Sequence, residues 1–235
     1  MGILPPMTVA IVGGTGDEGF GLAVRLAAAG VAVTIGSRAE ERAREAAGRA
    51  RQAAGPDAPV DGAENPAAVA GAELTFVTVP YEGQANTYRS LREHWPPGAL
   101  VCDTTTPLAT AVGGRPTQVL RPWQGSAAEQ AAALLPDGVR LVAGFHTVSA
   151  EPLTDLAEPL DADVLLCGDD GEAKGAVGAM VDRIPGSRWI DCGGLAMARV
   201  LEPITALLIS VNRKYGLRGS GVRLTGRDAW GPPPR

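Results

Sequence analysis

The chain has 235 residues, of which 45% are hydrophobic and 20% are charged, and its formal net charge is −5. This balance is typical of a globular protein and excludes a disordered chain. No basic block offsets the negative charge, so we expect no binding to nucleic acid through its phosphates.

Cysteine and histidine are too few and too scattered for a metal centre. The three cysteines and two histidines are Cys102, Cys167, Cys192, His94 and His146. We predict no metal site and no disulfide framework. Residues 1–7 lack the basic start of a signal peptide, and no apolar stretch approaches the length of a membrane span. We therefore expect a cytoplasmic protein with no membrane partner.

Strand and helix patterns alternate along the first half of the chain. Residues 8–12 form a short β-branched run, and residues 20–29 carry apolar side chains at helical spacing before Gly30. A second strand is predicted over residues 31–35 and an Ala/Arg/Glu-rich helix over residues 40–54. The next predicted elements are a brief helix from Asn65, a strand over residues 74–79, a helix over 84–94 and a strand over 100–103.

The second half continues this alternation after a loop over residues 104–122, which is rich in Thr, Gly and Pro. Ser126 and Glu129 form a capping box that opens a helix. Strands are predicted over residues 139–143, 164–167 and 188–190, and helices over residues 172–184 and 197–214. The whole pattern predicts an α/β fold with a doubly wound parallel sheet.

A glycine-rich motif follows the first predicted strand and opens the first predicted helix. Its residues are Gly14, Thr15, Gly16, Asp17, Glu18 and Gly19, in the pattern G-x-G-x-x-G. In this position the pattern indicates a Rossmann unit that binds a dinucleotide. Gly14 is expected to permit the tight turn, Gly16 to admit the pyrophosphate, and Gly19 to let helix and strand pack closely. The alternative is a glycine-rich turn without a ligand.

Two carboxylates within this motif conflict with an anionic ligand. Asp17 and Glu18 stand where the helix N-terminus offers its free N–H groups to phosphates. Like charges repel, so we expect both side chains to point away from the pyrophosphate.

The end of the second strand favours NADP over NAD. NAD sites place Asp or Glu there to bind the ribose hydroxyls. This chain instead has Ser37 and Arg38, with Arg42 one helical turn further. A hydroxyl and two guanidinium groups suit a 2′-phosphate. The alternative is that these arginines belong to an exposed, highly charged helix.

Several motifs, in consistent order, resemble the NADPH:coenzyme F420 oxidoreductases. They are Val-Ala-Ile-Val-Gly-Gly-Thr-Gly over residues 9–16, Ile-Gly-Ser-Arg over 35–38, Thr-Val-Pro over 78–80, His-Thr over 146–147, Cys-Gly-Asp-Asp over 167–170, and Arg199 with Glu202-Pro203. The likeness runs from about residue 7 to residue 224, nearly the whole chain. It is far more specific than the glycine motif alone.

The resemblance implies hydride transfer between C4 of the NADPH nicotinamide and C5 of the deazaflavin coenzyme F420. It implies a Rossmann domain over residues 7–167 and a smaller, helical C-terminal part over 168–228 that completes the substrate cleft. It also implies a homo-oligomer, which we expect to be a dimer, and small-molecule cofactors as the partners.

The resemblance also assigns site residues, carried over by matching position. Thr15 to Glu18 would face the pyrophosphate, and Ser37, Arg38 and Arg42 the 2′-phosphate. Val79 and Pro80 would line the nicotinamide side. The residues expected to border the stacked rings or to close the deazaflavin pocket are His146, Val148 and Ala150, and Gly219, Ser220 and Gly221.

The chain departs from the family pattern near the expected deazaflavin pocket. Tyr81 stands in place of a common Trp, and Ser149 in place of a proline. The segment Asp-Thr-Thr-Thr-Pro over residues 103–107 replaces a more apolar one, and the C-terminus extends into Gly-Pro-Pro-Pro. These changes leave room for a different second substrate.

No constellation for nucleophilic or obligatory acid–base catalysis is present in the sequence, as expected if two hydride carriers supply the chemistry. His146 is the one candidate catalytic residue, as a hydrogen-bond donor to a ring, and the alternative is a structural histidine. Arg199 and Glu202 are expected to form an ion pair one turn apart. Two functions compete with the main one: an NADPH-dependent reductase of another small substrate, and a non-catalytic NADP-sensing module.

Overall fold

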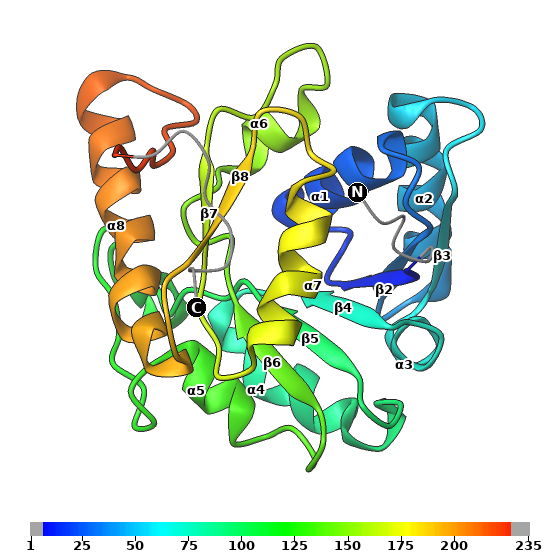
Figure 1. Cartoon of the computed structure of the whole chain (residues 1–235), viewed down its shortest axis with the longest axis horizontal. Helices are drawn as coiled ribbons and strands as arrows, with labels where there is room; N and C mark the ends of the chain where they lie inside the picture. Colours follow the sequence, from blue (N-terminus) through cyan, green and yellow to red (C-terminus); the bar gives the residue numbers. More distant parts are fainter. Residues whose placement is uncertain (1–6, 227–235) are drawn as a thin grey trace.

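The computed structural model describes residues 7–226. The residues before 7 and after 226 therefore lie outside it, including most of the segment considered as a signal peptide, the Gly-Pro-Pro-Pro extension, and the last two residues of the predicted C-terminal part. Strands and helices alternate through most of the described chain (Figure 1).

A six-stranded parallel sheet forms the centre of the molecule. Its strands, in chain order, are β1 Val9–Val12, β2 Val33–Ser37, β3 Val60–Glu64, β4 Leu74–Val77, β5 Leu100–Asp103 and β6 Arg140–Ala143. The spatial order is β3-β2-β1-β4-β5-β6. The order in which strands are added therefore reverses at β1: β2 and β3 lie on one side of it, and β4, β5 and β6 on the other. Ligands bind at such a switch point, beyond the carboxyl ends of the strands.

Helices cover both faces of the sheet. They are α1 Asp17–Ala28, α2 Glu40–Ala54, α3 Asn65–Ala70, α4 Tyr81–Ser90, α5 Ala127–Ala132, α6 Ala150–Thr154, α7 Gly171–Val181 and α8 Ala198–Tyr215, with 3₁₀ turns at Arg92–His94, Ala109–Val112 and Leu195–Met197. Alternate residues of each strand face opposite layers. Ile11 belongs to the core that α1, α2 and α7 cover, and Val12 to the core beneath α3, α4 and α5. The near-continuous apolar runs of the central strands follow from this double coverage.

A second, smaller unit follows the sheet. β7 (Asp163–Leu166) and β8 (Arg188–Asp191) pair in parallel, with α7 as their crossover. Ala143 at the end of β6 and Cys167 after β7 form an antiparallel bridge that joins the two sheets. α8 lies along one side of the molecule, next to this unit (Figure 1).

The predicted fold class is confirmed, and most predicted elements exist. β3 and α6 were not predicted, because Val60–Glu64 alternates small, acidic residues and α6 has only five residues. α1 begins at Asp17 rather than residue 20, and β4 ends two residues early, at Val77. The predicted cap is present, since the Ser126 hydroxyl accepts a hydrogen bond from the Glu129 N–H at 3.0 Å.

The predicted ion pair between Arg199 and Glu202 is wrong. Arg199 pairs instead with Glu129, at 2.6 Å. The Glu202 carboxylate is buried and accepts the N–H groups of Ala127 and Ala128, each at 3.0 Å. Both side chains of α8 thus hold the N-terminus of α5, a tertiary contact that spacing along one helix does not reveal.

One helix contradicts the expectation that no apolar stretch approaches the length of a membrane span. Among the described residues, Leu195–Tyr215 is long and apolar enough to cross a membrane by length and composition, with a mean hydropathy of 1.4. Length and composition alone are weak evidence, because helices of globular proteins also reach these values.

Candidate active site

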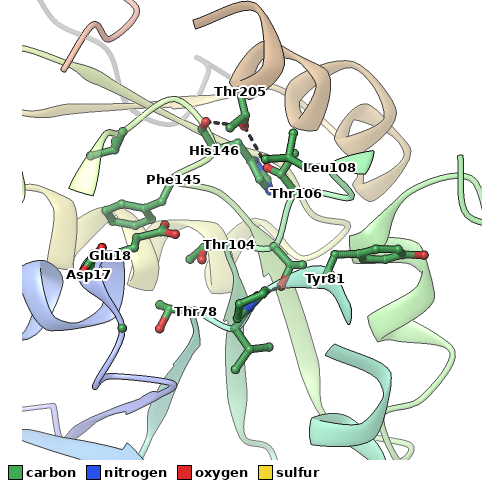
Figure 2. A pocket seen from close by; sticks show the side chains of 15 residues that line it. Asp17, Glu18, Thr78, Tyr81, Thr104, Thr106, Leu108, Phe145, His146 and Thr205 are labelled. Atoms are coloured by element: carbon green, nitrogen blue, oxygen red, sulfur yellow. Dashed lines mark hydrogen bonds between the residues drawn. The ribbon is translucent and has the colours of Figure 1, made fainter. Parts of the chain in front are cut away.

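An open cavity of about 300 Å³ lies beyond the carboxyl ends of the central strands. It is lined by Gly16, Asp17, Glu18, Thr78, Val79, Pro80, Tyr81, Thr104, Thr105, Thr106, Leu108, Phe145, His146, Val148 and Thr205. These residues come from the loops after β1, β4, β5 and β6, from the first residues of α1 and α4, and from α8 (Figure 2). Seven predicted site residues from different motifs therefore share one cavity: Gly16, Asp17, Glu18, Val79, Pro80, His146 and Val148.

The glycine loop has the geometry of a phosphate-binding turn. A Cβ on Gly14 would lie 2.8 Å from the Ile11 carbonyl oxygen, and a Cβ on Gly19 would collide with the Thr78 hydroxyl. A Cβ on Gly16 would meet only the Gly13 oxygen, at 3.4 Å. Gly14 and Gly19 are thus required by the protein's own packing, whereas the bare backbone of Gly16 leaves space for a ligand.

The expected role of Gly14 needs a correction. The left-handed residue of the turn is Gly13, with φ of 81°, and Gly14 is required because it packs against β1 and β2. The N-cap of α1 is Gly16, and no side chain caps this end. The first N–H groups of α1 are therefore available to an anion, as the motif predicts.

The two carboxylates of the loop differ in their surroundings. Asp17 is exposed, whereas Glu18 is partly buried and its side chain reaches into the cavity (Figure 2). Burial raises the pKa of Glu18 to about 8, against the opposing effect of the Thr104 hydroxyl and with a smaller contribution from Asp103. Glu18 is therefore largely neutral at neutral pH, which removes much of the charge conflict anticipated for this loop.

The candidate 2′-phosphate residues lie at the end of β2, next to β1 and its loop. Ser37 is buried, and its hydroxyl accepts the Ala39 N–H at 3.4 Å. Arg38 and Arg42 are exposed. Within residues 7–226 neither arginine takes part in a salt bridge, whereas Arg44 pairs with Glu40 at 2.7 Å. These three residues do not line the cavity.

The loop after β5 is anchored by a buried carboxylate. Asp103 accepts hydrogen bonds from the Tyr88 hydroxyl at 2.7 Å, the Gln84 amide at 3.0 Å and the Thr105 N–H at 2.9 Å. Burial raises the pKa of Asp103 to about 6, and these bonds oppose the rise. The anchored loop presents Thr104, Thr105 and Thr106 to the cavity. This is the segment that is expected, from the resemblance in sequence, to depart from the pattern of the F420 oxidoreductases.

His146 follows β6 and is buried in the cavity wall with 5% exposure. Neither of its ring nitrogens has a hydrogen-bond partner within the described structure. Burial lowers its pKa to about 4, so the imidazole is neutral at physiological pH. A buried polar ring without a partner is costly, which is consistent with a ligand that completes its hydrogen bonds.

The backbone around His146 is held by its neighbours. Phe145 has φ of 66°, an uncommon conformation for an aromatic residue, and packs edge-on against Phe76. The Thr205 hydroxyl of α8 donates to the His146 carbonyl at 2.7 Å and lies 2.9 Å from the Thr106 hydroxyl (Figure 2). α8 thereby reaches the cavity through one residue.

Four of the residues predicted to border the stacked rings or to close the deazaflavin pocket lie outside the main cavity. Ala150 lines a smaller hollow, together with Asp17 and Ser149. Gly219 packs against Pro152, and Gly221 lies against Ala162. The Ser220 N–H bonds to the side chain of Asn212 at 3.1 Å. The assignment of these residues to the deazaflavin pocket stays a prediction.

Four residues of the cavity were missed by sequence reasoning: Thr78, Leu108, Phe145 and Thr205. Phe145 carries no motif, and Thr205 lies within an apolar helix without any distinguishing pattern. Thr78 was quoted only as part of the Thr-Val-Pro motif, yet its hydroxyl donates to the Val12 carbonyl at 3.0 Å and so ties β4 to β1. Only Thr78 had a usable signal, its place directly after a central strand.

Within residues 7–226, no group of three or more His, Cys, Asp or Glu side chains could hold a metal ion. A phosphate-binding turn at the switch point of a parallel sheet, beside a cavity with apolar walls, defines the class of dinucleotide-binding Rossmann proteins.

Comparisons with known proteins narrow this class. The family model described as "NADP oxidoreductase coenzyme F420-dependent" matches residues 8–107. F420-dependent NADP reductase of Methanothermobacter thermautotrophicus is 42% identical over 221 residues, which are 93% of this chain and 95% of that protein. The enzyme of the same name from Methanocaldococcus jannaschii is 42% identical over 222 residues, 93% of this chain and 98% of its own length.

A solved structure agrees with these relatives. A protein from Arthrobacter sp. FB24, solved as a candidate F420-dependent NADP reductase, aligns with a TM-score of 0.77 at 25% identity and covers 94% of this chain and 100% of its own. The chain belongs to the family of F420-dependent NADP reductases. The predicted family is thus confirmed.

Proposed function

We propose that the protein transfers a hydride between C4 of the NADPH nicotinamide and C5 of coenzyme F420. The observation that carries this proposal is the cavity itself. In a chain of this family, it brings the phosphate-binding turn, Val79 and Pro80 after β4, and the unpartnered ring of His146 to one place. Two flat rings need such a cleft to approach face to face.

The residues present fit NADP(H). The free N–H groups of α1 and the bare Gly16 suit the pyrophosphate, and Arg38 and Arg42 suit the 2′-phosphate. Val79 and Pro80 offer an apolar wall for the nicotinamide. When bound, NADPH and F420 carry the hydride chemistry themselves, so the chain needs no nucleophile.

The chain's own contribution is orientation and the exclusion of water. Asp103 fixes the threonine loop on one side, and Thr205 fixes the backbone of His146 on another. The neutral imidazole of His146 can donate one hydrogen bond and accept another. We propose that it holds a polar edge of a bound ring, and that no side chain is obliged to move a proton during hydride transfer.

We also propose that residues 168–228 act as a smaller part that completes this cleft. Thr205 supports this division, because it brings α8 to the cavity. One observation speaks against this division, because β7 and β8 pair across the boundary at residue 167.

The remaining partner assignments are proposals as well. We infer a homodimer, because α8 exposes a stripe of large apolar side chains that includes Val200 at 56% and Leu207 at 60%. Such exposure is typical of a subunit interface. We propose a cytoplasmic enzyme of small-molecule cofactors, with neither nucleic acid nor membrane as a partner, and the net charge of −5 supports the first of these two exclusions.

The test follows the absorbance of F420 after NADPH is added to the purified protein. We expect F420 to be reduced with NADPH and only slowly with NADH. Oxidation of NADPH by a different acceptor alone would identify the protein as another reductase. Tight NADP binding without any turnover would identify an NADP sensor. Either of these results contradicts the proposal.

A further inference from the structure

The charged residues that line the cavity are acidic. The charged side chains that line it are Asp17 and Glu18, and among residues 7–226 neither lysine nor arginine lines it. His146 adds no positive charge, since burial lowers its pKa to about 4. Any formal charge that the protein places in this cavity is therefore negative.

The two oxidation states of the nicotinamide differ in charge. The oxidised ring is a cation and the reduced ring is neutral. An opposite charge nearby stabilises a cation, more strongly in a partly buried site than in water. A carboxylate beside the ring therefore distinguishes NADP⁺ from NADPH, whereas hydrogen bonds to the adenosine half cannot.

Glu18 is better placed for this role than Asp17. Asp17 is exposed, so that solvent screens its charge, whereas Glu18 is partly buried and reaches into the cavity that Val79 and Pro80 also line (Figure 2). The apolar wall formed by these two residues is where the proposed function places the nicotinamide.

Titratable groups near Glu18 come from α1, from β5 and from the loop after β6. Asp17 precedes it on α1, Cys102 and Asp103 lie near it at the end of β5, and His146 lines the same cavity after β6. Burial raises the pKa of Cys102 well above its usual value, so this thiol stays neutral. The pKa of Asp103 is about 6, so Asp103 is already ionised when Glu18 titrates near pH 8.

We propose that Glu18 determines the preference of the cleft for the oxidation state of NADP, its carboxylate favouring the cationic oxidised nicotinamide over the neutral reduced ring. This inference rests on the proposed function. It goes further by assigning the choice between NADP⁺ and NADPH to one residue.

A proton linkage follows from this role. Below pH 8 the Glu18 carboxyl holds its proton and is nearly indifferent to the charge of the ring. Above pH 8 it is ionised and attracts the oxidised ring. Binding of NADP⁺ consequently lowers the pKa of Glu18 and releases a proton, whereas binding of NADPH does not.

The experiment measures the dissociation constants of NADP⁺ and NADPH between pH 6.5 and 9.5, on the wild-type protein and on Glu18→Gln. For the wild type we expect the ratio Kd(NADPH)/Kd(NADP⁺) to rise about tenfold over this range, the change expected when one pKa moves by about one unit. For Glu18→Gln we expect a nearly constant ratio. The 2′-phosphate titrates in both cofactors and cancels in the ratio.

Two further variants sharpen the test. Glu18→Leu should behave like Glu18→Gln, so that a folding defect in one variant leaves the other to decide. Glu93→Gln removes an exposed acid elsewhere and should keep the wild-type pH dependence. A constant ratio in the wild type overturns the inference, as does a pH dependence that survives both Glu18 variants or that Asp17→Asn abolishes instead.

A probe without a nicotinamide separates the two proposals. Adenosine 2′,5′-bisphosphate should bind the wild type and Glu18→Gln equally at pH 6.5, where Glu18 holds its proton, because it lacks the nicotinamide whose charge Glu18 is proposed to distinguish. If it binds but the ratio is constant, the role of Glu18 is wrong and the nucleotide site stands. If none of the three nucleotides binds, the proposed function fails and the role of Glu18 fails with it.

Discussion

Arg38, between β2 and α2, and Arg42, in the first turn of α2, are exposed, and within residues 7–226 neither takes part in a salt bridge. A guanidinium without a protein partner is free to bind a phosphate, and it does so bidentately. At the residue scale, the preference for NADP over NAD therefore depends on very few side chains. Such a site responds strongly to a single substitution.

Arg38→Ala should raise the KM for NADPH about 10- to 100-fold, because a hydrogen bond to a charged group contributes about 1.5–3 kcal/mol. The KM for NADH should hardly change, since NADH has no 2′-phosphate. Steady-state kinetics with both cofactors measure this. Arg44→Ala is the matched control, because Arg44 is already paired with Glu40 and should leave both values unchanged. An unaltered preference for NADPH in Arg38→Ala contradicts the assignment of the phosphate site.

Gly16→Ala should separate ligand binding from folding. Its Cβ would touch no protein atom closer than 3.4 Å, so the melting temperature should change little, whereas NADP affinity should fall at least about tenfold as the methyl group occupies the pyrophosphate's space. Thermal melting and calorimetry measure the two effects.

Gly48→Ala is the control for this substitution. Gly48 lies in α2 with nothing within 4 Å of its Cβ position, and alanine should stabilise the helix by about 0.5–1 kcal/mol without a change in NADP affinity. Full NADP affinity in Gly16→Ala would show that the phosphates bind elsewhere.

At the element scale, α5 and α8 are joined by a buried carboxylate. Glu202 of α8 accepts the first two N–H groups of α5, and burial raises its pKa to about 8 from an ordinary value of 4.5. The folded state therefore holds this proton more tightly than the unfolded state does. The associated stability is fully present below pH 4.5 and is lost as the pH rises through 8.

Glu202→Gln should consequently weaken the dependence of stability on pH. The wild-type melting temperature is expected to fall between pH 6 and pH 9, with Glu18 and Glu202 both contributing. The variant should show a smaller fall, because glutamine resembles the protonated carboxyl and does not titrate. Melting curves across this range measure the difference, with Glu93→Gln as an exposed control. Equal slopes in the wild type and Glu202→Gln would rule out this role for Glu202.

Most elements could be predicted from the sequence because their signals are local. The apolar run over Leu74–Val77, the cap at Ser126 and the glycine loop each depend on neighbouring residues alone. The edge strand β3 could not be predicted, because Val60–Glu64 has little apolar character and pairs only with β2. Side-chain partners from distant parts of the sequence could not be predicted either, as the ion pair between Arg199 and Glu129 shows.

The candidate site was partly predictable for the same reason. Gly16, Val79 and Pro80 belong to motifs with a fixed place relative to a strand. The buried anchor of the threonine loop, Asp103, depends on Tyr88 and Gln84 from another element. The opposite pKa shifts of Glu18 and His146 depend on burial, which no local pattern contains.

At the scale of the whole molecule, we propose that the exposed apolar stripe of α8 forms the dimer interface. Leu207→Glu places a charge on this stripe and should convert the proposed dimer to a monomer, as measured by light scattering with size-exclusion chromatography. Val112→Glu is the matched control, because Val112 is also exposed, at 72%, but lies outside α8. A monomeric wild type, or a dimer that persists in Leu207→Glu, contradicts this interface.

We propose that one cleft holds both rings in contact, so that the hydride passes directly from one to the other. The most direct measurement uses NADPH that carries deuterium at C4 on the transferred face and follows the label by NMR and mass spectrometry. We expect one deuterium at C5 of the reduced F420 and none released to the solvent. Oxidation of the labelled NADPH without deuterium in F420 would contradict it.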